Sequence, residues 1–242
     1  MIHATSWLGQ SDDYGAQLRA IGADKYVDAW TWRRIGVTSD DQIDKADSLF
    51  NAGAEGKPLF NNEFEYFSPT SDDCFVNTAQ SIMNWLAFEN ARTWYWLHAL
   101  KPTYNSEASG YSLGFWRPHD DDDFTKFPQI KKGHWDYNQQ NFNAIAGFLK
   151  YMPWNSQRLK VQEYVVRKIN RILAFTTPQG RLVIMLSNRT HSPYTFNVSV
   201  ARETIFDARL YTPAKRDIEI GKVNGPTLSQ VVPAESVVFL VQ

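Results

Sequence analysis

The chain has 242 residues, 43% of them hydrophobic, which is enough apolar material for one large domain or two modest ones with real cores. Its 25 basic and 26 acidic residues leave a net charge of -1, so electrostatics gives no reason to expect nucleic acid or an anionic membrane as a partner. The single cysteine, Cys74, excludes an internal disulfide, and no residue spacing is typical of a zinc site. We therefore expect a globular protein that needs no metal or other cofactor.

Neither a membrane span nor a leader is expected. No apolar run reaches the length of about 18 residues that a transmembrane helix requires. The first residues lack a basic region followed by an apolar one, which a signal peptide would show. The cellular compartment is not predicted.

The first 151 residues alternate between predicted strands and helices. Strands are predicted at residues 2–8, 25–32, 58–60 and 93–97. Helices are predicted at about 12–21, with Gly22 as the C-terminal glycine, and at 39–52 after a capping box. A third is predicted to start at 71–73 and to carry apolar residues as far as Leu86, and a fourth at about 138–151. Residues 101–135 read as one long loop. This alternation predicts parallel strands joined by crossover helices.

The pattern changes near residue 158. Apolar runs at 182–186 and 237–241, a period-two stretch at 194–200, and turns at 178–180 and 224–226 predict strands without helices. We expect a small antiparallel β-sandwich of roughly seven or eight strands.

One stretch brings acidic and amide side chains to a strand end. Residues 57–66 read Lys-Pro-Leu-Phe-Asn-Asn-Glu-Phe-Glu-Tyr, so that Asn61, Asn62, Glu63 and Glu65 follow a short buried strand. Ligands and catalytic groups collect at the carboxyl ends of the strands in parallel α/β folds. This stretch is the predicted chemical site.

The same stretch carries a resemblance to a known group of enzymes. Pro58 to Glu63 resembles strand seven of clan A glycoside hydrolases, which are (β/α)8 barrels whose seventh strand ends with a glutamate nucleophile. The resemblance implies an α/β plus all-β fold, with residues 1–156 as strands five to eight of a TIM barrel and 157–242 as the sandwich. Residues 61–66 and 148–156 look most like the family 86 β-agarases and β-porphyranases, which act on red-algal galactans and are usually secreted.

The resemblance implies a mechanism of which the chain carries one part. A retaining glycosidase needs two carboxyl groups about 5 to 5.5 Å apart. Glu63 is the expected nucleophile, and Glu65 is its local rival because strand alternation puts both on one face. The acid/base glutamate of the clan ends strand four, which has no counterpart here. We therefore expect a second copy of the chain or a complementing amino-terminal half barrel as a partner. The alternative is a non-catalytic carbohydrate-binding or structural protein.

Further side chains are candidates for contacts with a polysaccharide or oligosaccharide, because aromatic rings and amide or basic groups suit sugars. These are Trp7, Trp32, Asn62, Trp94, Trp96, His98, Trp116 and Arg117, with Arg33, Arg34 and His134 as weaker candidates. The acidic run Asp120 to Asp123 could bind calcium, but a run of like charges in a loop is more often solvated, so no metal site is predicted.

Overall fold

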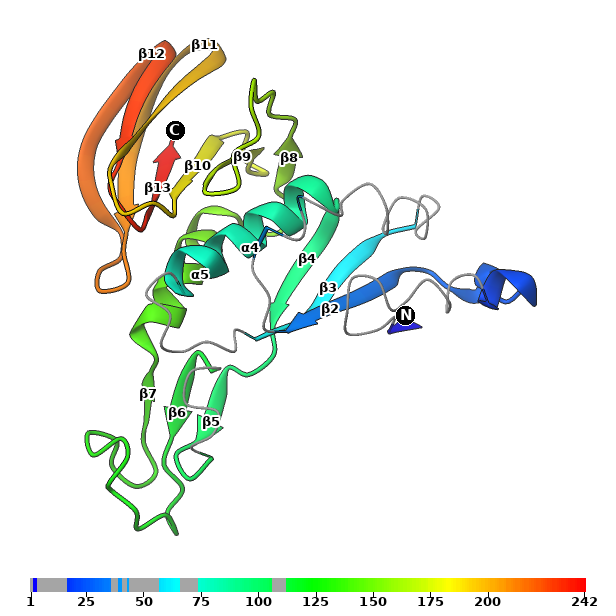
Figure 1. Cartoon of the computed structure of the whole chain (residues 1–242), viewed down its shortest axis with the longest axis vertical. Coiled ribbons are helices and arrows are strands. Elements are labelled where there is room, and N and C mark those ends of the chain that lie inside the picture. Colours follow the sequence, from blue (N-terminus) through cyan, green and yellow to red (C-terminus); the bar gives the residue numbers. More distant parts are fainter. Residues whose placement is uncertain are drawn as a thin grey trace. The chain divides into compact units, whose positions relative to one another are not determined.

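The computed structural model describes residues 2–3, 17–35, 39–40, 43, 57–65, 74–105 and 112–242, and for residues 2–3, 32–35 and 65 only the backbone. The fold is mixed α/β (Figure 1). Two compact units divide the chain, Met1–Ser71 with Asn84–Asn138, and Asp72–Met83 with Gln139–Gln242. The boundary at residue 156 that the sequence suggests does not coincide with these units and stays a prediction about domains.

The first unit is built on a four-stranded parallel sheet. Strands β1 (Ile2–His3), β2 (Trp30–Ile35), β3 (Leu59–Glu65) and β4 (Ala91–Trp96) lie in the order of the sequence, and each pairs in parallel with the next. The predicted parallel pairing is confirmed. The predicted strand at 58–60 is longer than expected, so Glu63 lies within β3 and not beyond its end.

The region before β2 contains a helix end that the sequence predicts correctly. Residues 17–20 are helical, and Gly22 follows with φ of +68°. The Gly22 amide donates to the Arg19 carbonyl and the Ala23 amide to the Leu18 carbonyl, which is the Schellman pattern that a glycine favours. A 3₁₀ turn, η1 (Asp24–Tyr26), comes next, so the strand predicted from residue 25 begins only at Trp30. The helix predicted at 39–52 lies almost wholly outside the described residues.

Helix α4 (Cys74–Phe88) confirms the helix that the spacing of apolar residues predicts. Its Trp85 packs in a core with four buried residues from the sheet and the segment before it, Val27, Trp30, Leu59 and Ala91. The Asn84 side chain donates to the Ser39 carbonyl at 2.8 Å. One face of the parallel sheet is thereby covered.

The loop predicted at 101–135 is wrong in part, because it carries a second small sheet. Strands β5 (Leu100–Pro102), β6 (Gly114–Trp116) and β7 (Trp135–Tyr137) pair in that order. β5 and β6 are parallel, and β6 and β7 are antiparallel (Figure 1). Each of these strands has only three residues, and polar, glycine and proline residues surround them, so the stretch as a whole has the composition of a loop.

The second unit is a six-stranded antiparallel sheet, not the two-sheet arrangement of seven or eight strands that was expected. Its strands are β8 (Gln157–Leu159), β9 (Asn170–Thr176), β10 (Leu182–Asn188), β11 (Tyr194–Tyr211), β12 (Ile218–Val232) and β13 (Ser236–Val241), in the order β12-β11-β13-β10-β9-β8. Two register shifts in the long β11–β12 hairpin bend it. A single bent sheet can thus bury Phe196, Phe206 and Leu186 in one core.

Helix α5 (Gln139–Tyr151) packs on this sheet through a close contact. A Cβ at Gly147 would lie 2.2 Å from the Phe239 ring, so only glycine fits there. Phe148 is buried against the same ring, whereas Leu149 beside it is exposed. Among the described residues, no helix combines the length and the hydropathy that crossing a membrane requires.

Candidate strand-end site

The carboxyl half of β3 contains an irregularity that reorients its side chains. Against β2, Trp32 pairs with Asn61 and Arg33 pairs with Glu63, so Asn62 is an extra residue in the ladder. Against β4, Asn61 pairs with Trp94 and Phe64 with Trp96, which shows the same shift. A bulge of this kind changes the face to which the following side chains belong.

The bulge decides the face of the sheet on which Glu63 lies. Leu59 faces the α4 side, because it packs in the core with Trp85. Strict alternation would put Glu63 on that same side, since the two are four residues apart. The register shift at Asn62 moves Glu63 to the opposite face, which it shares with Phe60 and Thr93, while Asn61 and Phe64 remain on the α4 side. Glu63 is partly buried there.

Several polar atoms around this strand end are buried and have no hydrogen-bond partner among the described residues. They are the amide atoms of Asn61, Oδ1 of Asn62, Oγ1 of Thr93 and Nε1 of Trp94. Asn61 is fully buried. Buried polar atoms in native proteins nearly always have partners, so this end of β3 and β4 is where further groups are needed.

Trp94 and Trp96 do not flank Glu63 as the sequence suggested. The Phe64 ring lies 4.7 Å from the Trp94 ring and 5.5 Å from the Trp96 ring, and the two indoles are 6.0 Å apart. The register puts this cluster on the α4 side of the sheet, opposite Glu63. Their predicted role as sugar platforms beside the nucleophile is therefore not supported, and they pack the strand end instead.

Arg117 is a structural residue and not a sugar contact. Its side chain is fully buried, and all five of its N–H groups donate: Nε to the Ile130 carbonyl, Nη1 to Asp121 and the Asp123 carbonyl, and Nη2 to the Lys126 and Phe127 carbonyls, at 2.6 to 3.1 Å. No donor is left for a ligand. The guanidinium holds together the segment that joins β6 to β7.

The acidic run beside Arg117 is part of the same structural cluster. Asp121 accepts hydrogen bonds from Thr103, from the Asp123 amide and from Arg117, and the Thr103 bond is the main cause of its lowered pKa. Across the part of the chain that the structure describes, no group of three or more histidine, cysteine, aspartate or glutamate side chains could hold a metal ion. These contacts give Asp121 a structural role in the segment that joins β6 to β7.

The remaining predicted residues divide into three groups. Trp7 and the side chains of Trp32, Arg33, Arg34 and Glu65 lie outside what the structure describes. The carbonyls of His98 and His134 accept bonds from Leu113 and Arg117 amides, which fixes the backbone around β6. Trp116 is exposed on β6. Two aromatic residues that the sequence reasoning missed, Trp135 and Tyr137, lie on β7 next to it; their period-two spacing could have indicated a strand.

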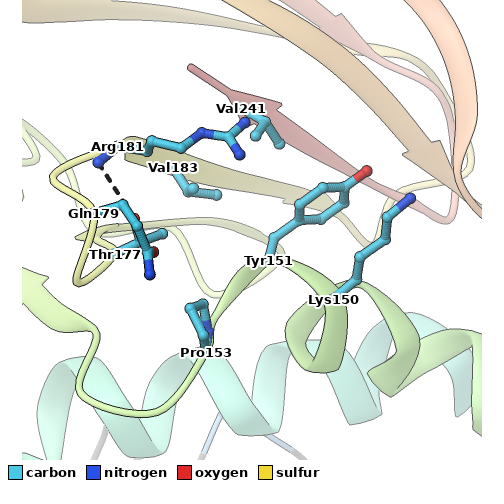
Figure 2. Close-up of a pocket in the computed structure, with 8 residues that line it drawn as sticks. All are labelled: Lys150, Tyr151, Pro153, Thr177, Gln179, Arg181, Val183 and Val241. Carbon is cyan, nitrogen blue, oxygen red and sulfur yellow. Dashed lines mark hydrogen bonds between the residues drawn. The ribbon is translucent and has the colours of Figure 1, made fainter.

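The second unit holds a separate pocket, which Figure 2 shows. It is lined by Lys150, Tyr151, Pro153, Thr177, Gln179, Arg181, Val183 and Val241, and its volume is about 180 Å³. Ligand pockets commonly measure roughly 300 to 1,000 Å³, so this one is small for an oligosaccharide. The Arg181 amide donates to Thr177 Oγ1 at 3.3 Å, which closes the β9–β10 turn at its rim. We assign it no part in the chemistry.

A four-stranded parallel sheet followed by an antiparallel β unit makes this a mixed α/β protein, and its fold is similar to that of glycoside hydrolase domains. No protein family model matches the chain, and no curated protein matches it. Solved structures do. A GH30 xylanase C catalytic domain from Talaromyces cellulolyticus aligns with a TM-score of 0.66 at 16% identity, covering 99% of this chain and 51% of that one.

Two further structures show the same likeness. A GH30 endoxylanase from Clostridium papyrosolvens C71 aligns at a TM-score of 0.60 and 13% identity, covering 90% of this chain and 50% of that one. A GH51 arabinofuranosidase from Xanthomonas axonopodis pv. citri aligns at 0.64 and 12%, covering 99% and 57%. The chain spans about half the length of these proteins, and at such identities the likeness concerns the fold.

Proposed function

We propose that this chain carries the nucleophile half of the active site of a retaining glycoside hydrolase, with Glu63 as the nucleophile. The observation that carries the proposal is the bulge at Asn62, which moves Glu63 to the sheet face opposite α4. In a β/α barrel that face is the interior, where catalytic residues project from the carboxyl ends of the strands. The fold likeness to xylanases and an arabinofuranosidase agrees with this chemistry.

The second carboxyl group has to come from outside the described sheet. A general acid is typically worth 10² to 10⁴ in rate, so Glu63 alone would be a poor catalyst. Within the described residues the sheet ends at β1 and β4. We propose that strands of a second copy, or of a complementing half barrel, pair with these edges and bring the acid/base group.

The substrate proposed is a polysaccharide. The sequence resemblance favours a galactan such as agarose or porphyran, whereas the solved structures of similar fold are named for xylan, arabinofuranoside and β-1,6-glucan chemistry. All of these polysaccharides should be tested as substrates, because the shape of the sugar-binding subsites depends on loops and not on the strands.

Substitution of Glu63 tests the proposal directly. Glu63→Gln keeps the size of the side chain and removes the nucleophilic carboxylate, so hydrolysis of the best substrate in the panel should fall by roughly 10³-fold or more. Glu203→Gln, an exposed position on β11, is the matched control and should keep full activity. Reducing-end release on each polysaccharide gives the rate, and analysis of the anomeric product gives the stereochemistry.

An active wild type whose rate survives Glu63→Gln would refute the role of Glu63. Inversion at the anomeric carbon would refute the retaining mechanism. Wild type without hydrolysis on any substrate, in a preparation of known association state, would favour a non-catalytic carbohydrate-binding protein. The exposed aromatic residues Trp116 and Trp135 favour that second candidate, since they would bind sugars without any carboxyl group.

A further inference from the structure

One face of the small β5–β6–β7 sheet is made of large exposed aromatic and apolar side chains. Trp116 is 40% exposed, Trp135 64%, Tyr137 37% and Leu100 45%. We call these four residues the aromatic face. Single exposed apolar residues are ordinary, but four side by side on one small sheet mark a binding surface.

The strand register shows that these side chains belong to one face. Trp116 pairs directly with Trp135, and Gly114 lies between its partners Leu100 and Tyr137. Residues two apart along a strand share a face, so the Trp116–Trp135 pair and the Leu100–Gly114–Tyr137 row lie on the same face of the sheet. The alternate positions, Lys101 and Phe115, are buried on the other face.

The aromatic face is held flat and rigid from behind. The Phe115 ring stacks on the Phe127 ring at 4.3 Å, and Arg117, directly after β6, is fixed by all five of its donors. Gly114 lets the neighbouring strands and the Leu100 side chain pack closely over it, because a Cβ there would lie 2.6 Å from the Asp136 carbonyl and 2.9 Å from the Leu100 side chain. The surface is therefore built in advance of binding, which lowers the entropic cost of association.

Hydrogen bonds tie this sheet to the strand end that carries Glu63. The Leu97 amide donates to the Phe64 carbonyl at 3.0 Å, and the Leu113 amide donates to the His98 carbonyl at 3.0 Å. Three residues, 97–99, separate β4 from β5, a span of about 11 Å at most. The aromatic face thus begins near the edge of the sheet at which the proposed chemistry occurs.

We infer that the aromatic face is a sugar-binding platform that holds a polysaccharide chain beside the Glu63 site. None of its side chains is charged, which disfavours nucleic acid or a charged peptide. Indole and phenol groups offer flat apolar surfaces with polar edges, which match the apolar faces and peripheral hydroxyls of pyranose rings. The inference rests on the proposed function for the class of ligand, but the platform can be tested by binding alone.

Binding is measured in the Glu63→Gln background, so that hydrolysis cannot interfere. Affinity electrophoresis in gels containing xylan, agarose, porphyran or β-1,6-glucan gives a dissociation constant for each polysaccharide. Trp135→Ala should weaken binding to the preferred polysaccharide about tenfold or more. Trp135→Leu keeps an apolar side chain without a ring and should bind the polysaccharide nearly as weakly as Trp135→Ala. Trp154→Ala removes an exposed tryptophan from the second unit and is the matched control, expected to bind like its parent.

The outcomes distinguish sugar binding by the aromatic face from hydrolysis at Glu63. Selective loss of binding in the Trp135 variants, with near-ultraviolet circular dichroism and melting temperature retained, supports the platform whether or not wild type hydrolyses any substrate. Unchanged binding in both Trp135 variants, or no retardation of the parent by any of the four polysaccharides, overturns it. A change of association state in Trp135→Ala on sedimentation also overturns it, because the face would then be a protein interface.

Discussion

At the scale of single residues, Arg117 shows how a side chain that looks like a ligand contact in the sequence can be a buried structural group. Arg117 follows a tryptophan in a stretch rich in glycine and aspartate and looked like a ligand contact. In the structure it is fully buried and bonded to four carbonyls and Asp121. Its planar fork of five donors suits this position, which an ammonium group with three donors could not fill.

Arg117→Met is therefore expected to destabilise the first unit by about 3 kcal/mol or more, because it leaves buried acceptors without donors. Arg117→Lys should recover only part of this loss. Thermal unfolding followed at the tryptophan signal measures both. Lys126→Met, at an exposed position of the same segment, is the control. A melting temperature for Arg117→Met equal to that of wild type would show that the guanidinium network does not hold this segment.

At the scale of elements, turns and bulges determine which side chains each strand places on each face of its sheet. The bulge at Asn62 is the example in the parallel sheet. In the second unit, Asp217 lies in the β11–β12 turn with φ of +55°, a conformation that aspartate and asparagine tolerate better than most residues. There it pairs with Lys150 and accepts a 2.5 Å bond from the Tyr151 hydroxyl, so the turn is fastened to the end of α5.

The ionisation of Asp217 and Lys150 predicts that the stability of the second unit depends on pH. Burial raises the pKa of Asp217, but hydrogen bonds from Lys150 and Tyr151 outweigh it and hold the pKa below its ordinary 3.8. The hydrogen bond to Asp217 raises the pKa of Lys150 above 10.5. The stabilisation by the Asp217–Lys150 pair is therefore fully present between pH 3.8 and pH 10.5. It is lost as the pH falls through the lowered pKa of Asp217 or rises through the raised pKa of Lys150.

Asp217→Asn keeps the turn conformation and removes the charge. We expect it to cost about 1 kcal/mol or less at neutral pH, since Lys150 is half exposed, and to cost progressively less below pH 3.8. Urea titrations at neutral and acidic pH measure the difference. Asp207→Asn breaks the more exposed pair with Lys222 and should have a smaller effect. An equal loss for Asp217→Asn at every pH would contradict the ionic origin.

At the scale of the whole molecule, the parallel sheet raises the question of what completes it. Parallel sheets are normally covered and closed, because unpaired edge groups that are buried each cost roughly 1 to 3 kcal/mol. The described sheet has edges at β1 and β4, and the solved proteins of similar fold are about twice as long. If the proposed function is correct, strands from outside the described sheet would have to complete it.

We expect this chain to associate at micromolar concentration, or to gain activity when mixed with a complementing amino-terminal half barrel. Pairing at the β4 edge should protect the amides of Ala91–Trp96 from hydrogen exchange, and the protection should rise with protein concentration. Sedimentation velocity gives the association state, and Trp154→Ala, an exposed position in the second unit, should not change it. A well-folded monomer with no concentration dependence would rule out the closed-barrel assembly.

The sequence by itself determined helix α4, the parallel pairing of the first strands and the candidate glutamate, because apolar periodicity and the Pro58 to Glu63 stretch are local signals. It could not determine which face Glu63 occupies, since that depends on one extra residue in a ladder formed with distant strands. It also could not separate the buried Arg117 from the exposed Trp116 beside it. Tertiary structure decided those points, because pairing register and burial are set by contacts between segments far apart in the chain.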